Sequence, residues 1–236
     1  MTDFSVSVRD LAYTWRGQSK PTLNIDTLTI QHGERIILRG PSGSGKSTLL
    51  SLLAGVHDVQ DGELHVLGKS LKTMSQSQRD RYRADHMGYI FQQFNLLPFL
   101  TVQQNVLLAV EFSRARRERL EKAGVNASQE SERLLTSLGI HNQLWHKPAS
   151  ELSVGQQQRV AAARALIGAP EILIADEPTS ALDADARDNF LALLKEECGR
   201  HNITLIFVTH DASLASHFDR IIELQSINKV ALEVHS

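Results

Sequence analysis

The fold is decided by the stretch Gly40-Pro41-Ser42-Gly43-Ser44-Gly45-Lys46-Ser47-Thr48, which fits the pattern G-x-x-x-x-G-K-[ST]. One apolar run, residues 36–38, precedes it, and another, residues 49–54, follows it. This order predicts a strand, a glycine-rich loop and a helix. The glycines allow backbone N–H groups to turn inward and form an anion site at the helix N-terminus. We therefore predict a nucleotide-phosphate site, in which Lys46 reaches the β- and γ-phosphates and the hydroxyl of Ser47 ligates Mg²⁺.

The composition is that of an ordinary globular protein. The chain has 236 residues, 42% hydrophobic and 22% charged, which suits one large domain or a core with an inserted subdomain. Its net charge of −2 gives no electrostatic reason to expect nucleic-acid binding. The one cysteine, Cys198, excludes an internal disulfide, suits a reducing compartment and is expected to pack on the apolar side of a helix.

No segment of the sequence has the features of a membrane span or of a signal peptide. No apolar run approaches the roughly 18 residues needed to cross a bilayer. The first five residues lack both the basic and the apolar region of a signal peptide. We therefore expect a cytoplasmic protein without direct bilayer insertion, which reaches a membrane only through a partner.

Strands and helices alternate along both ends of the chain. The predicted strands lie near residues 6–8, 25–30, 36–38, 87–91, 172–175 and 205–208, and the predicted helices near 49–54, 153–167 and 184–198. Continuous apolar strands that alternate with helices indicate a mostly parallel sheet with helices on both faces. The fold class is therefore predicted to be α/β.

The middle of the chain is predicted to be helical. Thr101 and Gln104 match a capping box, which opens a helix through Phe112. The charge-dense segment 113–119 is interpreted as a solvated helix face or turn rather than a nucleic-acid patch, because acidic residues interrupt its positive charge. A further helix is predicted near 128–138 and ends at a glycine.

The domain prediction follows from this pattern. We predict one domain over residues 1–236. Its nucleotide-binding α/β core comprises residues 1–93 and 152–236, and residues 94–151 form an inserted helical subdomain.

Side chains that could act on a bound nucleotide follow three of the predicted strands. Asp176 and Glu177 end the apolar strand 172–175, and open α/β sheets place ligands at the carboxyl ends of their strands. A phosphate-loop enzyme needs one carboxylate for Mg²⁺, which suits Asp176, and a group that polarises the attacking water, which suits Glu177. His210 ends the next apolar strand, where it can hydrogen-bond a γ-phosphate oxygen or serve a structural role. Gln92 ends an earlier strand and can contact Mg²⁺ or the water.

A second possible anion site begins at residue 152. Residues 152–159 read Leu-Ser-Val-Gly-Gln-Gln-Gln-Arg, a Ser/Gly helix start that contains no lysine. An anion site without its own lysine would be incomplete. One physical explanation is that Ser153 and the amide of Gly155 serve a phosphate bound to another copy of the chain.

Together these motifs resemble those of the nucleotide-binding subunit of an ABC transporter, over essentially the whole chain. In the family's order, residues 40–48 are similar to Walker A, Gln92 to the Q-loop, 152–156 to the signature, 172–177 to Walker B, 180–183 to the D-loop and His210 to the switch histidine. The resemblance implies a RecA-like P-loop core with a mostly parallel sheet, an N-terminal antiparallel β part and the helical insertion. It also implies an ATP hydrolase that uses ATP and Mg²⁺.

The same resemblance implies roles for individual residues. Catalysis falls to Glu177, His210, Gln92 and Lys46, Mg²⁺ binding to Ser47, Gln92 and Asp176, and nucleotide binding to the stretch Gly40 to Thr48 together with Trp15, Ser153, Gly155, Gln156 and Asp183. Trp15 stands where the family's adenine-stacking aromatic falls, with Tyr13 as the alternative. Val154 departs from the glycine of the commonest signature, which bears on how closely this backbone approaches the nucleotide.

Residues 91–101 most resemble ATPases of the lipoprotein-releasing, macrolide-efflux and cell-division type. The resemblance implies two copies arranged head to tail around two ATP molecules, and an integral-membrane permease as partner. The implied location is cytoplasmic, peripheral on the cytoplasmic face of the inner membrane. Apolar residues of this segment line either a groove for the permease's coupling helix or an ordinary seam between subdomains; they are Phe94, Leu96, Leu97, Phe99 and Leu100.

Three other functions are weighed against transport. An ABC ATPase that regulates an extracytoplasmic hydrolase through a membrane partner is barely distinguished by the sequence of this chain. A soluble ABC ATPase acting on DNA or ribosomes fits less well, because the chain has one cassette and nearly neutral charge. A P-loop kinase or GTPase is disfavoured by the signature, by His210 and by the lack of a guanine-reading Asn/Thr-Lys-x-Asp motif.

Overall fold

The computed structural model describes residues 4–230, which divide into two compact units. The first unit holds residues 4–83 and 206–230, and the second holds residues 84–205. No helix in the described part of the chain is both long enough and apolar enough for a membrane crossing.

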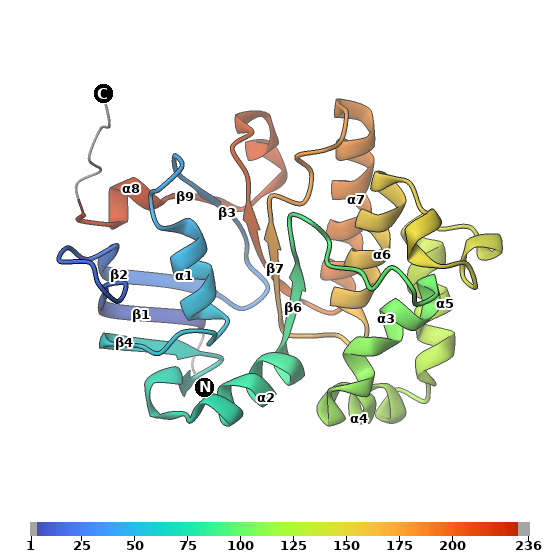
Figure 1. Cartoon of the computed structure of the whole chain (residues 1–236), viewed down its shortest axis with the longest axis horizontal. Helices are drawn as coiled ribbons and strands as arrows, with labels where there is room; N and C mark the ends of the chain where they lie inside the picture. Colours follow the sequence, from blue (N-terminus) through green and yellow to red (C-terminus); the bar gives the residue numbers. More distant parts are fainter. Residues whose placement is uncertain (1–3, 231–236) are drawn as a thin grey trace. The chain divides into compact units, whose positions relative to one another are not determined.

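The first unit contains a four-stranded antiparallel sheet in the order β2-β1-β4-β5. Figure 1 labels β2, β1 and β4 of this sheet. Its strands are β1 (Phe4–Tyr13), β2 (Leu23–Gln31), β4 (Asp61–Val66) and β5 (Lys69–Ser70). Val8 of β1 pairs with Leu28 on one side and with Leu64 on the other, and all three side chains are buried. The predicted N-terminal antiparallel β part is therefore present.

A parallel strand pair and the phosphate-loop helix complete the core of the first unit. Strand β3 (Arg35–Arg39) pairs in parallel with β9 (Arg220–Glu223), and α1 (Lys46–Leu53) follows β3. Its shorter elements are η1 (Leu71–Thr73), η4 (Ala212–His217) and α8 (Leu224–Ile227). Two elements, α2 (Gln76–His86) and β8 (Thr204–Val208), have residues in both units.

The second unit pairs β6 (Met87–Ile90) in parallel with β7 (Ile172–Asp176) and is otherwise helical. Its helices, green to orange in Figure 1, are α3 (Val102–Glu111), α4 (Arg114–Lys122), α5 (Ala127–Ser137), α6 (Val154–Leu166) and α7 (Ala184–Arg200), with the short turns η2 (Asn142–Leu144) and η3 (Ala149–Glu151). Helix α6 packs on α3, α5, α7 and β6. These elements confirm the α/β fold class with a helical segment after β6.

The helix starts follow from local capping chemistry. Thr101 caps α3 and Ser153 caps α6, each in a capping box with the glutamine three residues on. Both starts had been predicted from the sequence. Cys198, which was expected on an apolar stripe, is buried in α7.

The interpretation of segment 113–119 as a solvated helix face is wrong at two residues, Ser113 and Arg116, of which Ser113 is only 1% exposed. Arg116 in α4 is only 2% exposed. Its guanidinium donates to the carbonyl oxygens of Ala84 and Met87 and to those of Ala165 and Ile167 at the end of α6. Burial lowers the pKa of Arg116 to about 10, so the group stays charged at neutral pH, and four carbonyl acceptors replace its water.

A second arginine joins α5 to α7. Arg133 donates to both carboxylate oxygens of Glu197, at 2.9 and 3.1 Å, and also to Glu130. Glu197 is 2% exposed, and burial alone would raise its pKa. The pKa of Glu197 nevertheless lies below its ordinary value. Hydrogen bonds to its carboxylate, of which that from Arg133 has the largest effect, and the positive charges of Arg133 and Arg200 lower it.

We predict that Glu197→Gln lowers the free energy of unfolding at pH 7 by about 2 kcal/mol, less than for a fully buried pair because Arg133 is 35% exposed. The folded-state pKa is lowered, so the stabilisation is complete above the unfolded pKa of about 4.3 and is lost as the pH falls through the folded value. Urea denaturation of both proteins between pH 3.5 and 7 measures this. Glu196→Gln, at an exposed pair with Arg200, is the control. A deficit that does not shrink below about pH 4 would contradict this role of the charge.

Candidate functional site

The loop between β3 and α1 forms a concave backbone cradle. Gly43 and Gly45 have φ values of 78° and 97°, which glycine adopts without strain. A Cβ on Gly45 would lie 2.7 Å from Cδ2 of Leu23, so a larger residue there would displace Leu23 as well as strain the backbone. The side chain of Lys46, 9% exposed, donates from Nζ to the carbonyl oxygens of Gly40 and Pro41, at 2.6 and 3.0 Å. The loop thus holds its own lysine at its mouth.

Asn228, which the sequence analysis missed, supports this loop from the other end of the chain. It is 8% exposed, and its Nδ2 donates to the carbonyl oxygens of Thr22 and Ser44, while its Oδ1 accepts from the N–H of Asn24 at 2.8 Å. No local pattern in the sequence points to Asn228, because the three partners that lie in and near the loop are about two hundred positions away.

The aromatic residues near the loop differ in exposure. Tyr13 is 7% exposed and Trp15 is 36% exposed. The indole Nε1–H of Trp15 donates to Oγ1 of Thr48 at 3.3 Å, which ties Trp15 to the first turn of α1. Of these two residues Trp15 is the more exposed, and it is the better candidate for base stacking.

His210 follows β8 and is exposed. The next residue, Asp211, donates its N–H to Oγ1 of Thr209 and caps η4 through its carboxylate. The short turn after β8 is therefore fixed on both sides of His210.

In the second unit, the β6–β7 register places two predicted site residues at matching positions. Ile90 pairs with Ala175, so Gln92 and Glu177 each lie two residues beyond the same pair, at the carboxyl ends of neighbouring parallel strands. Burial, and to a smaller extent the nearby charge of Asp176, raises the pKa of the Tyr89 phenol. Glu177 has a φ of 45°, a left-handed conformation that is strained for a glutamate.

The chain after Gln92 is also held in a left-handed conformation. Phe94 and Asn95 have φ values of 58° and 50°. Arg164 of α6 donates to both of their carbonyl oxygens, at 2.6 and 2.7 Å. Arg164 is a second supporting residue that the sequence analysis missed, and it ties the Gln92 loop to the helix that Ser153 begins.

The segment 152–159 is an ordinary capped helix start with an exposed tip. The Ser153 hydroxyl accepts from the N–H of Gln156, and Oε1 of Gln156 accepts from the N–H of Ser153. Val154 is the first residue of α6 and is 50% exposed. Its isopropyl group therefore adds bulk at the helix tip while the backbone stays helical. Asp183 caps α7 by accepting from the N–H of Ala186 at 2.8 Å.

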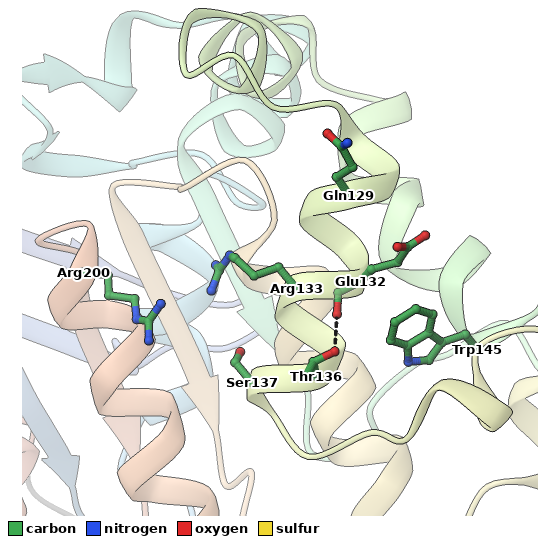
Figure 2. Close-up of a pocket in the computed structure, with 7 residues that line it drawn as sticks. All are labelled: Gln129, Glu132, Arg133, Thr136, Ser137, Trp145 and Arg200. Carbon is green, nitrogen blue, oxygen red and sulfur yellow. Dashed lines mark hydrogen bonds between the residues drawn. The ribbon is translucent and has the colours of Figure 1, made fainter.

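An open cavity of about 510 Å³ lies elsewhere in the second unit. Figure 2 shows the residues that line it. Five lining residues come from α5, namely Gln129, Glu132, Arg133, Thr136 and Ser137, and Trp145 and Arg200 complete it. None of the predicted site residues lines it. Its two guanidinium groups are already paired with Glu130, Glu196 and Glu197, so this cavity offers no unbalanced charge for an anion.

Comparison with known proteins decides the family. A family model described as "ABC transporter" matches residues 23–180, about two thirds of the chain. The chain belongs to the ABC transporter family. This confirms the predicted resemblance and the predicted enzyme class, an ABC-type ATPase.

Curated relatives of this ABC chain are of two lengths. It is 43% identical over 211 residues to the uncharacterised ABC transporter ATP-binding protein YbbA of Escherichia coli (strain K12), covering 88% of this chain and 89% of the relative. It is also 43% identical over 199 residues to the macrolide export ATP-binding/permease protein MacB of Pasteurella multocida (strain Pm70), covering 84% of this chain. The chain spans only 29% of the length of that MacB relative.

Solved structures give the same fold. A dimeric post-hydrolysis state of the ATP-binding cassette MJ0796 bound to ADP and Pi has a TM-score of 0.81 and 31% identity, covering 98% of this chain and 99% of that one. CbiO1 from Clostridium perfringens, described as part of the ABC transporter complex cbiONQ, has a TM-score of 0.79 and 27% identity, covering 94% and 86%.

We predict that Asn228→Ala weakens ATP binding about tenfold, or about 1.4 kcal/mol, because the phosphate loop loses one of its anchors. Isothermal titration with ATP measures this. Asn228→Asp keeps an acceptor for Asn24 but puts a buried carboxylate against the carbonyl oxygens of Thr22 and Ser44, so its ATP affinity should fall at least as far as that of Asn228→Ala. Unchanged affinity in Asn228→Ala would show that the loop does not depend on this anchor.

Proposed function

We propose that this chain is the ATP-binding and ATP-hydrolysing subunit of an ABC transporter and drives a separate membrane permease through ATP-dependent dimerisation. The observation that carries the proposal is the cradle of residues 40–48, with its left-handed glycines and its internally held Lys46. A backbone cradle with a lysine at its mouth at a helix N-terminus suits nucleotide phosphates and little else.

The residues of the loop fit ATP. The hydroxyl of Ser44 is buried and has no hydrogen-bond partner among the described residues, so it can donate to a phosphate oxygen. A Cβ on Gly43 would meet no atom within 4 Å in the described part of the chain, so the loop is open on that side. Ser47, on the first turn of α1, is exposed.

A bound Mg²⁺ is compatible with the few protein ligands that the chain offers. Residues 4–230 contain no cluster of three or more His, Cys, Asp or Glu that could enclose a metal. Mg²⁺ does not require one, because it keeps several waters and takes phosphate oxygens as ligands. We propose Ser47, Asp176 and Gln92 as its protein contacts. When bound, the ion offsets negative charge on the phosphates.

We propose the following division of chemical work among the side chains. Glu177 accepts a proton from the water as the water oxygen bonds to the γ-phosphorus and the bond from that phosphorus to the β–γ bridging oxygen breaks, giving ADP and phosphate. Lys46 stabilises charge on the transferred group, and His210 donates to a γ-phosphate oxygen. Gln92 orients the water.

The second anion site is assigned to a second copy of the chain. Ser153, Gly155 and Gln156 of one copy would complete the nucleotide site of the other, with Asp183 at the interface. Support comes from the exposed tip of α6 and from the MJ0796 cassettes, whose structures are described as dimeric. Hydrolysis then removes contacts that hold the copies together, and their spacing changes.

The permease contact is assigned to the loop after Gln92. Phe99 is 76% exposed and Leu97 is 38% exposed. The buried side chain of Asn105 fixes this loop by accepting from the N–H of Leu97 and donating to the carbonyl oxygens of Leu97 and Leu100. A rigid loop with exposed apolar groups suits a helix-in-groove contact.

The names of the relatives support the kind of transporter. MacB is named a macrolide export ATP-binding/permease protein, and YbbA an ABC transporter ATP-binding protein. We therefore propose a permease of the export, lipoprotein-release or mechanotransmission type, and a location on the cytoplasmic face of the inner membrane through that permease.

We predict that Glu177→Gln binds ATP normally, accumulates as an ATP-bound dimer and loses at least 99% of its hydrolytic turnover, a factor of about 100 typical for a lost general base. Size-exclusion chromatography with light scattering and a phosphate-release assay measure the two effects. Turnover at the wild-type rate would remove Glu177 from the mechanism.

We predict that Phe99→Arg abolishes co-purification with the permease from solubilised membranes, because a charge enters an apolar contact. The control is Phe112→Arg, since Phe112 is 78% exposed at the end of α3, outside this loop. Equal retention of the permease by both variants would contradict the proposed contact.

A further inference from the structure

The loop that carries Trp15 lies on the surface of the first unit. Residues 15–21 are all exposed. Its backbone is closed by hydrogen bonds from the N–H of Gln18 to the carbonyl oxygen of Trp15 and from the N–H of Thr22 to that of Tyr13. Such a loop would lose considerable conformational entropy on binding a ligand unless other groups fix it beforehand.

One such group is the side chain of Gln60. Its Oε1 accepts from the backbone N–H of Thr14 at 2.8 Å, and its Nε2 donates to the carbonyl oxygen of Thr14 at 2.9 Å. A single amide thus satisfies both backbone groups of the residue before Trp15. This reciprocal pair fixes the chain where the Trp15 loop begins.

The second group is His57. Its ring lies perpendicular to the indole of Trp15, at 82° with 4.8 Å between ring centroids. Tyr13 makes a similar contact with Trp15, at 88° and 5.3 Å. With the bond from Nε1 to Thr48, three side chains hold the indole while 36% of Trp15 stays exposed. Perpendicular ring pairs of this kind are favourable and orient both rings.

Both groups belong to the segment that follows α1. Helix α1 begins with Lys46 and ends at Leu53, and His57 and Gln60 come four and seven residues later. Thr48 lies on the first turn of the same helix. The phosphate end of the site and the indole are therefore tied to one helix and the turn after it.

We propose that Gln60 and His57 are positioning residues that hold Trp15 at a fixed place relative to the phosphate loop and thereby set the affinity for the base of the nucleotide. The inference rests on the proposed function, in which Trp15 stacks on adenine. Neither residue touches the nucleotide in this account. They act by ordering the Trp15 loop and its indole before the ligand arrives.

The test uses Trp15 as its own reporter. The chain has two tryptophans, so Trp145→Phe leaves Trp15 as the only one, and its emission then reports on a stacked base. Gln60→Ala, His57→Ala and His57→Phe are made in that background. ADP is titrated by fluorescence and by calorimetry, and inorganic tripolyphosphate, which has no base, is titrated by calorimetry.

We expect the ADP dissociation constant to rise five- to tenfold in Gln60→Ala and His57→Ala while the tripolyphosphate constant stays within twofold, an effect confined to the base. His57→Phe keeps a perpendicular aromatic ring and should restore most of the ADP affinity. Gln76→Ala, at an exposed glutamine of α2, is the matched control and should change neither constant.

The outcomes separate this inference from the proposed function. If ADP binds by calorimetry but leaves Trp15 emission unchanged in the parent protein, the stacking of the base on Trp15 fails. If ADP quenches Trp15 but its affinity is the same in the parent and in both alanine variants, the positioning role is overturned. Equal losses of ADP and tripolyphosphate affinity would also overturn it, because they would show a general structural role.

Discussion

Phosphate binding by backbone N–H groups imposes the constraint on which the rest of the structure depends. The loop must keep glycines at left-handed φ and hold a lysine at its mouth before any ligand arrives. Gly43 and Gly45 meet the first demand, and the carbonyl oxygens that accept from Lys46 meet the second. Two other parts of the first unit contact the loop. Asn228 fixes it from the end of the chain, and Gly45 leaves room for Leu23 of β2.

In the second unit, arginine side chains fix the segments next to the proposed site residues. Arg164 binds the two strained carbonyls after Gln92, and Arg116 binds carbonyls at the start of β6 and at the end of α6. Helix α6 thus has the exposed Ser153 and Val154 at its start, and at its end the guanidinium of Arg116 donates to the carbonyl oxygens of Ala165 and Ile167. Strand β6 likewise begins at Met87, whose carbonyl oxygen accepts from Arg116, and leads to Gln92. Helix α6 and strand β6 are therefore both held by the buried cation Arg116, at the end that lies away from the proposed site residue.

Features that depend on local chemistry could be predicted from the sequence. The capping boxes at Thr101 and Ser153 and the apolar strand before Asp176 lie within a few residues of their partners, so the pattern contains the reason for the structure. The supporting residues could not be predicted in this way. Asn228 lies about two hundred positions from the loop segments it binds, and a charged Arg116 is buried only because distant carbonyls accept from it. The position of Trp15 in the family pattern already favoured it over Tyr13, and the difference in exposure, which spacing does not reveal, supports that preference.

The central claim is that each ATP site is completed by a second copy, and complementation between two inactive variants tests it most directly. Lys46→Met removes the phosphate-loop lysine, and Ser153→Arg blocks the signature, so each variant alone should be inactive. A mixed dimer would pair the intact phosphate loop of the Ser153→Arg copy with the intact signature of the Lys46→Met copy. An equimolar mixture should then recover about a quarter of wild-type turnover, since half of randomly formed dimers are mixed and each holds one intact site of two. A mixture that stays inactive, or a Ser153→Arg protein that turns over ATP at the wild-type rate by itself, would contradict the account.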